Sequence, residues 1–549
     1  MRKYIGWIWH NTQGIRLNIA VRVAVGLIQV GLGLALVWLC KDFIDVTIRT
    51  GSDRDVWIRV VVLAGVILGS IGLRQIYYYL GIEARTRQSN DIRLRIFSQL
   101  MRRRLFEGKS MHSGDLVSRL EKDIDLISDT IASMMPETLV TCAKLAGAFL
   151  MLRWMDATLA WVLLLLTPPF VITGKLIAKR LRNMTHGIRQ QESTIQKTIQ
   201  EGLEHNAVLR ALESTGWLTT QVDDMQQELR SRVNLRTRFS VMTRSFMAAI
   251  FGLGYLLVFV WGGMQLRNGA ITLGVMISFL QLVGQVQHPI LSLLNSIPQL
   301  IHSTASIDRL TELEQLQTET AATPLPAASD PWGIRLDNIS FKYAQGDMPV
   351  MNHFSHDFQP GSHTAIMGHT GAGKTTLFRL LLGLTEPATG TITLYNKNEK
   401  QLQAGTGTRQ YMIYVPQGNT LMSGTIRYNL LLARPDATDE QLRQVLHTAM
   451  ADFVFDLTNG MDTVIGETGS GLSEGQAQRI AIARGLLRPG NILLLDEISS
   501  ALDEQTESEL FRRLFTASPQ KTILLITHRS SVASQCDKTI TMGTYPEEA

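Results

Sequence analysis

The first 310 residues alternate long apolar runs with polar, basic stretches. A bilayer core about 30 Å thick requires roughly 20 residues of apolar helix to cross it. Six windows meet this requirement, although Lys144 and Arg244 interrupt the third and the fifth. The pattern predicts six transmembrane helices, near Leu17–Cys40, Trp57–Leu80, Ile131–Trp154, Thr158–Ala178, Phe239–Trp261 and Ile271–Leu294.

Two long connections, Gly81–Thr130 and Lys179–Arg238, alternate with three short ones and hold most of the basic residues between the windows. Because loops rich in Lys and Arg remain on the cytoplasmic side, both long loops and both termini are predicted to be cytoplasmic. Apolar residues three and four apart in both loops also predict that the helices continue beyond the membrane.

The rest of the chain has short apolar runs between charged helical segments, a pattern typical of a soluble α/β domain. The segment TELEQLQTETAATPLPAASDPWG is polar and rich in Ala, Thr and Pro, so it is interpreted as a linker. We therefore predict a transmembrane domain over 1–310, a linker over 311–332 and an α/β domain over 333–549.

Composition narrows these predictions further. A net charge of +5 over 549 residues is modest, and its cations cluster between apolar runs, which argues against a nucleic-acid partner. Cys40, Cys142 and Cys536 are too far apart to suggest a disulfide framework or a metal site. The N-terminal MRKYIGWIWH lacks a cleavable signal pattern and is interpreted as an amphipathic segment at the membrane surface, with Trp7 and Trp9 at headgroup depth.

The predicted α/β domain contains a phosphate-binding loop of the form G-x-x-x-x-G-K-[ST]. It follows a strand pattern, HTAIM, and precedes a helical one, as the motif requires. Backbone N–H groups of such a loop surround phosphate oxygens, while the lysine reaches the β- and γ-phosphates and the threonine hydroxyl binds Mg²⁺. The predicted nucleotide-binding residues are Gly368, His369, Thr370, Gly371, Ala372, Gly373, Lys374, Thr375 and Thr376.

Three further strand patterns end in polar residues: NILLLDE in Asp496 and Glu497, MIYVPQ in Gln417, and TILLITH in His528. Ligands of open α/β sheets gather at the carboxyl ends of the strands, so these side chains are predicted to converge on phosphates held by Lys374. Asp496 would hold the Mg²⁺ shell, together with Thr375 and Gln417. Glu497 would polarise the attacking water.

A fifth motif, GLSEGQ, precedes a helical run. Ser473 and Gln476 have the spacing of a capping box, which leaves backbone N–H groups at the helix start free to meet an anion. An ordinary capped helix is the alternative, and spacing alone favours that alternative.

These motifs occur in the order found in ATP-binding cassette (ABC) transporters, which the chain resembles over nearly its whole length. The half with six spans resembles the exporter branch, and SGDLVSRLEKDID resembles the first cytoplasmic loop of such exporters. The resemblance implies alternating access driven by ATP and Mg²⁺ in a dimer of half-transporters.

The resemblance also assigns roles to single residues. It implies that Tyr343 stacks on adenine and that Ser473, Gly475 and Gln476 complete the ATP site of the opposite subunit. It further implies that Asp503 communicates between the two sites and that Glu467 touches the membrane-domain loops.

Two features depart from the family pattern. The usual LSGGQ reads LSEGQ here, which places Glu474 near an anion site. The chain also ends about twenty residues after His528, short of the terminal helix that many relatives carry. We expect the first change to be tolerated if the Glu474 side chain points away from ATP.

The resulting hypothesis is ATP-driven export or flipping of an amphiphile, a lipid, drug or peptide-like molecule, across the cytoplasmic membrane. A nucleotide-gated channel and an importer are the alternatives; Glu497 and His528 favour hydrolysis over gating alone. A homodimer is favoured because one chain supplies every part of a site, and a heterodimer remains open.

Charges within the predicted spans suggest an anionic cargo. Arg22 and Arg74 lie at inner-leaflet depth and Lys144 lies deeper, and charges within spans often face a pathway. Gln281 and Gln285, one turn apart in the sixth span, would add hydrogen bonds. The alternative is that the arginines snorkel to lipid phosphates and the glutamines join helices.

Overall fold

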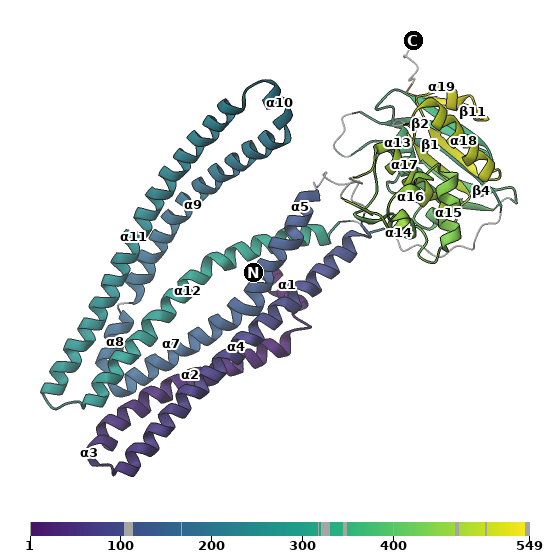
Figure 1. Ribbon diagram of the computed structural model, residues 1–549. Coiled ribbons are helices and arrows are strands. Elements are labelled where there is room, and N and C mark those ends of the chain that lie inside the picture. The colour runs from purple at the N-terminus through teal and green to yellow at the C-terminus, as the bar shows by residue number, and fades with distance from the viewer. Residues whose placement is uncertain are drawn as a thin grey trace. The chain divides into compact units, whose positions relative to one another are not determined.

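The computed structural model describes residues 2–103, 113–165, 167–316, 318–319, 330–343, 348–398, 400–466, 471–499 and 502–543. The chain forms two compact units (Figure 1). The first, Met1–Phe97 with Gly114–Glu314, is helical, and the second, Ser98–Ser113 with Gln315–Ala549, contains all of the strands in the described residues.

The helical unit consists of long helices joined by short turns. They are α1 (Arg2–Asn11), α2 (Arg16–Asp42), η1 (Phe43–Thr47), α3 (Ile48–Thr50), α4 (Asp53–Leu100), α5 (Ser113–Ser118), η2 (Arg119–Asp123), α6 (Ile124–Asp129), η3 (Thr130–Met134), α7 (Met135–Met155), α8 (Ala157–Leu165), α9 (Thr167–Glu204), α10 (Asn206–Ala211), α11 (Thr215–Arg267) and α12 (Leu273–Glu314).

Each predicted transmembrane window falls on these helices. Within the described residues, four segments are long and apolar enough to cross a membrane: Arg16–Thr50, Asp53–Leu100, Gly114–Met155 and Thr215–Arg267. The start of α12, Leu273–Gln287, is a shorter apolar segment. The window 158–178 falls on α8 and α9, where residue 166 lies outside the described residues. The polytopic helical membrane domain that the sequence predicts is therefore confirmed.

The second long loop is a helical hairpin, as its periodicity predicted. Helix α9 continues to Glu204, α10 turns the chain, and α11 returns alongside α9 as an antiparallel neighbour (Figure 1). This hairpin exposes large apolar side chains, among them Leu203, Leu212 and Trp217. An isolated surface rarely exposes so much apolar area, so the hairpin is a candidate contact surface.

Helix α1 lies against the end of α12. Lys3 pairs with Asp308 at 3.0 Å, and the Trp7 indole N–H donates to Glu314 at 3.1 Å. Ile5 and Trp9 are 62% and 65% exposed. The polar face of α1 thus contacts α12, and the Arg16 guanidinium lies 4.0 Å from the Trp9 ring centroid. The location of Trp7 and Trp9 at a membrane surface stays a prediction.

The α/β unit has two main sheets. A parallel sheet has the strand order β11-β3-β10-β9-β6, and an antiparallel sheet has the order β2-β1-β4-β5. The strands are β1 (Trp332–Phe341), β2 (Met351–Phe358), β3 (His363–Gly368), β4 (Thr389–Asn396), β5 (Gln401–Gln403), β6 (Met412–Val415), β7 (Gly424–Thr425), β8 (Val464–Ile465), β9 (Ile492–Asp496), β10 (Thr522–Ile526) and β11 (Lys538–Met542).

Helices cover the parallel sheet and complete two separate cores. They are α13 (Lys374–Leu381), η4 (Gly407–Tyr411), α14 (Ile426–Leu431), α15 (Asp439–Thr448), α16 (Phe453–Asp456), η5 (Gly460–Asp462), α17 (Glu474–Leu487), α18 (Glu504–Ala517) and α19 (Ser530–Ala533). Along β9, Ile492 and Leu494 enter the core shared with α13 and the antiparallel sheet, whereas Leu493 and Leu495 enter the core shared with α17 and α18. This alternation explains the uninterrupted apolar run of a strand buried on both faces.

Candidate nucleotide site

The phosphate-binding loop connects β3 to α13. Gly368, Gly371 and Gly373 have φ values of +149°, +88° and +87°, which side chains with a Cβ rarely adopt. A Cβ at Gly368 would also lie 2.5 Å from the carbonyl oxygen of Met542. Lys374 is 6% exposed, and its ammonium donates to the carbonyl oxygen of Gly368 at 2.7 Å. Lys374 thus lies across the phosphate-binding loop, where its ammonium is predicted to contact the phosphates.

Asp496 ends β9 beside the start of α13. The Thr375 hydroxyl donates to one of its carboxylate oxygens at 3.4 Å, and the Tyr414 hydroxyl donates to the other at 3.4 Å. Asp496 is 1% exposed, and this burial raises the pKa of its carboxyl, with the nearby Glu497 charge adding to the effect. Oxygen ligands brought together in this way suit a hard cation such as Mg²⁺.

Glu497 lies at the centre of a second network. Gln417 donates its amide to one oxygen at 2.7 Å, and His528 Nε2 lies 3.0 Å from the other. Lys374 Nζ is 3.8 Å from the latter oxygen and 3.0 Å from the same imidazole nitrogen. The structure therefore gathers the four residues predicted to be catalytic.

Backbone strain and proton positions distinguish this network from an ordinary ion pair. Glu497 has a φ of +48°, an uncommon conformation for a residue with a Cβ. His528 Nε2 can donate to Glu497 or accept from Lys374, but a single nitrogen cannot do both at once. The Glu497 backbone is fixed as well, because Gln478 donates to its carbonyl oxygen at 3.2 Å.

Tyr343 follows β1 and lies beside the start of α13. Its hydroxyl is 3.1 Å from the Thr376 hydroxyl and accepts from Arg379 at 3.0 Å. Its ring packs edge-to-face on Phe341, with 4.9 Å between the centroids. The predicted adenine-stacking residue is thus next to the loop's last threonine, and its role in binding adenine remains a prediction.

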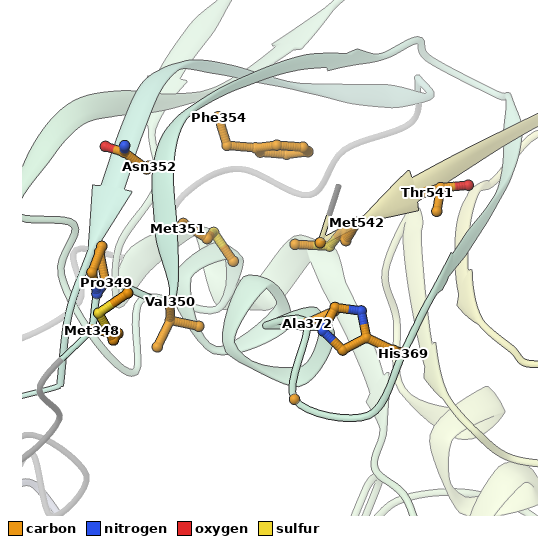
Figure 2. Close-up of a pocket in the computed structure, with 12 residues that line it drawn as sticks. Met348, Pro349, Val350, Met351, Asn352, Phe354, His369, Ala372, Thr541 and Met542 are labelled. Carbon is orange, nitrogen blue, oxygen red and sulfur yellow. The ribbon is translucent and has the colours of Figure 1, made fainter. Parts of the chain in front are cut away.

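A cavity of about 350 Å³ lies beside the phosphate-binding loop (Figure 2). His369 and Ala372 contribute from the loop, Met351 and Phe354 from β2, and Met542 from β11. The cavity combines apolar side chains with the polar Asn352, His369 and Thr541, and it is not lined by the acidic residues of the site. It extends the surface around the loop without contributing to the catalytic network.

The GLSEGQ motif forms the capped start of α17, as the spacing of Ser473 and Gln476 predicted. Ser473 accepts from the backbone N–H of Gln476 at 3.2 Å, and the Gln476 side chain accepts from the backbone N–H of Ser473 at 2.9 Å. Gly475 is buried, whereas Glu474 is exposed. No hydrogen bond or ion pair given for the described residues joins Ser473 or Gln476 to Lys374 or Glu497.

Asp503 caps α18 by accepting from the backbone N–H of Thr506 at 2.9 Å, and this bond lowers the pKa of its carboxyl. Its communication between two sites remains a prediction. Glu467, residues 500–501 and the last six residues, 544–549, lie outside the described part of the chain.

The charged residues of the spans divide into two groups. Arg22 is 6% exposed, stacks over the Tyr77 ring at 4.3 Å and donates to the carbonyl oxygen of Ala132. A Cβ at Gly81 would lie 2.6 Å from the guanidinium carbon, so this glycine makes room for the arginine. Arg22 is therefore buried against neighbouring helices, whereas Arg74 is exposed.

Sequence reasoning missed two residues that shape the site. Tyr414 contacts Asp496, and Gln478 contacts the Glu497 backbone. Tyr414 lies in β6, three residues before Gln417, so the alternation along β6 could have placed it on the Asp496 face. Gln478 carries no such signal, because its position depends on how α17 packs on the sheet.

Two protein-family models match separate parts of the chain. The model for the ABC transporter transmembrane region matches residues 20–290, and the ABC transporter model matches residues 351–500. The chain belongs to the ABC transporters. It is an ATP-hydrolysing membrane exporter with the transmembrane and ATPase domains fused in one chain, as the resemblance implied.

Individual relatives agree with this membership. A Bacillus subtilis protein provisionally named a multidrug export ATP-binding/permease protein, YgaD, is 26% identical over 99% of this chain and 94% of its own length. The ABC multidrug transporter mdr2 of Aspergillus fumigatus is 29% identical over 78% of this chain, which spans about half of that longer protein (55%). A bacterial Atm1-family ABC exporter, solved with ATP bound, superimposes with a TM-score of 0.80 over 96% of this chain and 94% of its own at 20% identity, which shows a shared fold.

Proposed function

We propose that two copies of this chain form an exporter that moves an amphiphile from the inner leaflet of the cytoplasmic membrane, with ATP hydrolysed at the interface between the two α/β domains. The observation that carries the proposal is the division of the motifs within one chain. Lys374, Glu497 and His528 form one network, while the Ser473 capping box lies at a helix start outside it. A second chain supplying the free N–H groups of α17 would complete the site.

Catalysis in this proposal depends on positioning and electrostatics. Lys374 exchanges its carbonyl partners for phosphate oxygens, since a charged acceptor forms the stronger hydrogen bond. Glu497 leaves Gln417 and orients a water for attack, while His528 meets the charge that develops on the γ-phosphate. The network thus holds the catalytic carboxylate beside Lys374 and His528.

The residues present fit a magnesium ion. The Thr375 hydroxyl and the buried Asp496 carboxylate supply adjacent oxygens, and the Gln417 side-chain carbonyl is available when its amide binds Glu497. When bound, Mg²⁺ would neutralise charge on the β- and γ-phosphates. We assign Thr375, Asp496 and Gln417 to hold it.

The cargo assignment rests on the membrane unit. The positive long loops favour a cytoplasmic location for the α/β domain, which places Arg74 toward the inner leaflet. An exposed cation within a span commonly faces a water-filled pathway or a partner helix. We therefore propose an amphiphilic substrate with an anionic head.

Reconstitution of the purified chain tests this function. In vesicles with outward-facing α/β domains, ATP should drive accumulation of a fluorescent amphiphile, and Glu497→Gln should abolish it. Transport that is equal with and without ATP would contradict the proposal. A folded dimer of this chain alone that lacks ATPase activity would replace the homodimer with a heterodimer.

A further inference from the structure

The segment after α12 is anchored, although its composition resembles a flexible linker. Arg103 and Thr318 form an antiparallel β-bridge, and the Arg103 guanidinium donates to the carbonyl oxygen of Leu316. The Glu319 backbone N–H donates to the carbonyl oxygen of Arg102 at 2.9 Å. The described residues 316 and 318–319 therefore run beside the chain that follows α4.

Glu319 makes a two-pronged ion pair with Arg409. Both carboxylate oxygens accept from the guanidinium, each at 2.7 Å. The side chains are only 18% and 24% exposed. A planar, paired arrangement shielded in this way fixes geometry far better than an exposed single contact does.

Arg409 also binds the end of the helix that starts at the phosphate-binding lysine. Its guanidinium donates to the carbonyl oxygens of Leu382 at 2.6 Å and Gly383 at 2.8 Å. Helices leave their last carbonyls without intrahelical partners, and a cation there complements the helix dipole. Gly383 has a φ of +60°, which ends α13 and directs its carbonyl group toward this contact.

Arg409 also lies just before β6 in the sequence, and β6 leads to Gln417. Arg409 lies in η4, β6 follows at once, and Gln417 is two residues beyond the end of β6. One guanidinium thus connects the back of α13, which Lys374 begins, with the element that carries the amide bound to Glu497.

We propose that Glu319 and Arg409, here called the linker clasp, are positioning residues that couple the nucleotide site to the segment following α12. Movement of α13 or β6 when ATP displaces Lys374 and Gln417 shifts the Arg409 fork and, through Glu319, the linker. This rests on the proposed function, because coupling has a purpose only if ATP drives α12. The clasp acts through other residues and touches no substrate.

Hydrogen–deuterium exchange of the full-length chain in lipid nanodiscs tests the clasp. All variants are made in a Glu497→Gln parent, which is predicted to bind ATP with greatly slowed hydrolysis. In the parent, ATP should change exchange in the peptide that covers residues 315–319 by at least about fivefold, the low end of coupling between sites. Glu319→Gln should remove this response without altering ATP binding. Arg409→Lys should do the same, because lysine keeps the charge but loses the fork.

Glu312→Gln is the matched control. Glu312 lies near the end of α12 and pairs with Arg119 at 2.8 Å, outside the clasp. This variant should respond to ATP like the parent. A full response in both clasp variants, or no response in the parent, would overturn the proposal.

Transport measured in proteoliposomes separates the two proposals. With Glu497 intact, Glu319→Gln should leave the KM for ATP within about twofold and lower taurocholate moved per ATP at least about fivefold. An unchanged ratio would contradict the clasp while the exporter function stands. An exchange response in the Glu497→Gln parent, combined with no ATP-driven transport of any probe by the chain with Glu497 intact, would contradict the exporter function alone.

Discussion

Glu497→Gln replaces one carboxylate oxygen by an amide at the centre of the network with Gln417 and His528. A positioned general base contributes about 10²–10⁴-fold to a rate, so kcat should fall by that factor. The substitution also weakens two charge-assisted bonds, to Gln417 and His528, which exceed neutral ones by roughly 1 kcal/mol each. Because ATP binding is proposed to break these bonds, affinity for ATP should stay constant or tighten up to about thirtyfold.

The assay combines phosphate release with binding of a fluorescent ATP analogue. Lys374→Ala serves as the comparison, since it removes the cation that meets the phosphates and should weaken binding itself. A kcat for Glu497→Gln within about threefold of the parent value would refute the role of this carboxylate, since general-base catalysis accounts for far more. Weakened ATP binding in that variant would refute the claim that the resting network competes with nucleotide.

Three further predictions concern other parts of the chain. Gly81→Ala should displace the Arg22 guanidinium, lower the free energy of unfolding by about 1–3 kcal/mol and so lower the thermal unfolding temperature, while Gly72→Ala, with open space around it, should not. Burial lowers the pKa of His363, so the folded state resists protonation; stability should decline as pH falls below about 6.5, and calorimetry of His363→Gln should show a weaker decline. Arg74→Ala should reduce ATPase stimulation by the anion taurocholate more than by the cation rhodamine 6G. An equal reduction would contradict the proposal of an anionic cargo.

The convergence of Gln417, Asp496, Glu497 and His528 at one edge of the parallel sheet could be predicted from sequence, because it follows from strand direction. Parallel strands end at one edge, so the residues after β6, β9 and β10 had to approach the loop after β3. The capping box at Ser473 was equally local, since both of its bonds span three residues. Short-range rules therefore sufficed for the nucleotide-binding part of the site, although the assigned roles still await experiment.

Contacts between distant segments could not be predicted in this way. The Glu319–Arg409 pair joins residues 90 positions apart, and the polar composition around Glu319 indicates only a linker. Arg22 was placed in a cavity because a charge in a span often faces one, but periodicity does not reveal which neighbour covers a helix face. The small residue at Gly81, on another helix, decides that Arg22 is buried.

A mixed dimer tests the composite ATP site most directly. Chains carrying Lys374→Ala and chains carrying Ser473→Arg, with different affinity tags, are co-expressed and purified in tandem. If each site combines Lys374 of one chain with Ser473 of the other, the mixed dimer keeps one intact site and each parental dimer keeps none. The account predicts ATPase activity near half of the unaltered dimer's for the mixture and almost none for the parents. A mixed dimer that binds ATP yet is as inactive as both parents would contradict it.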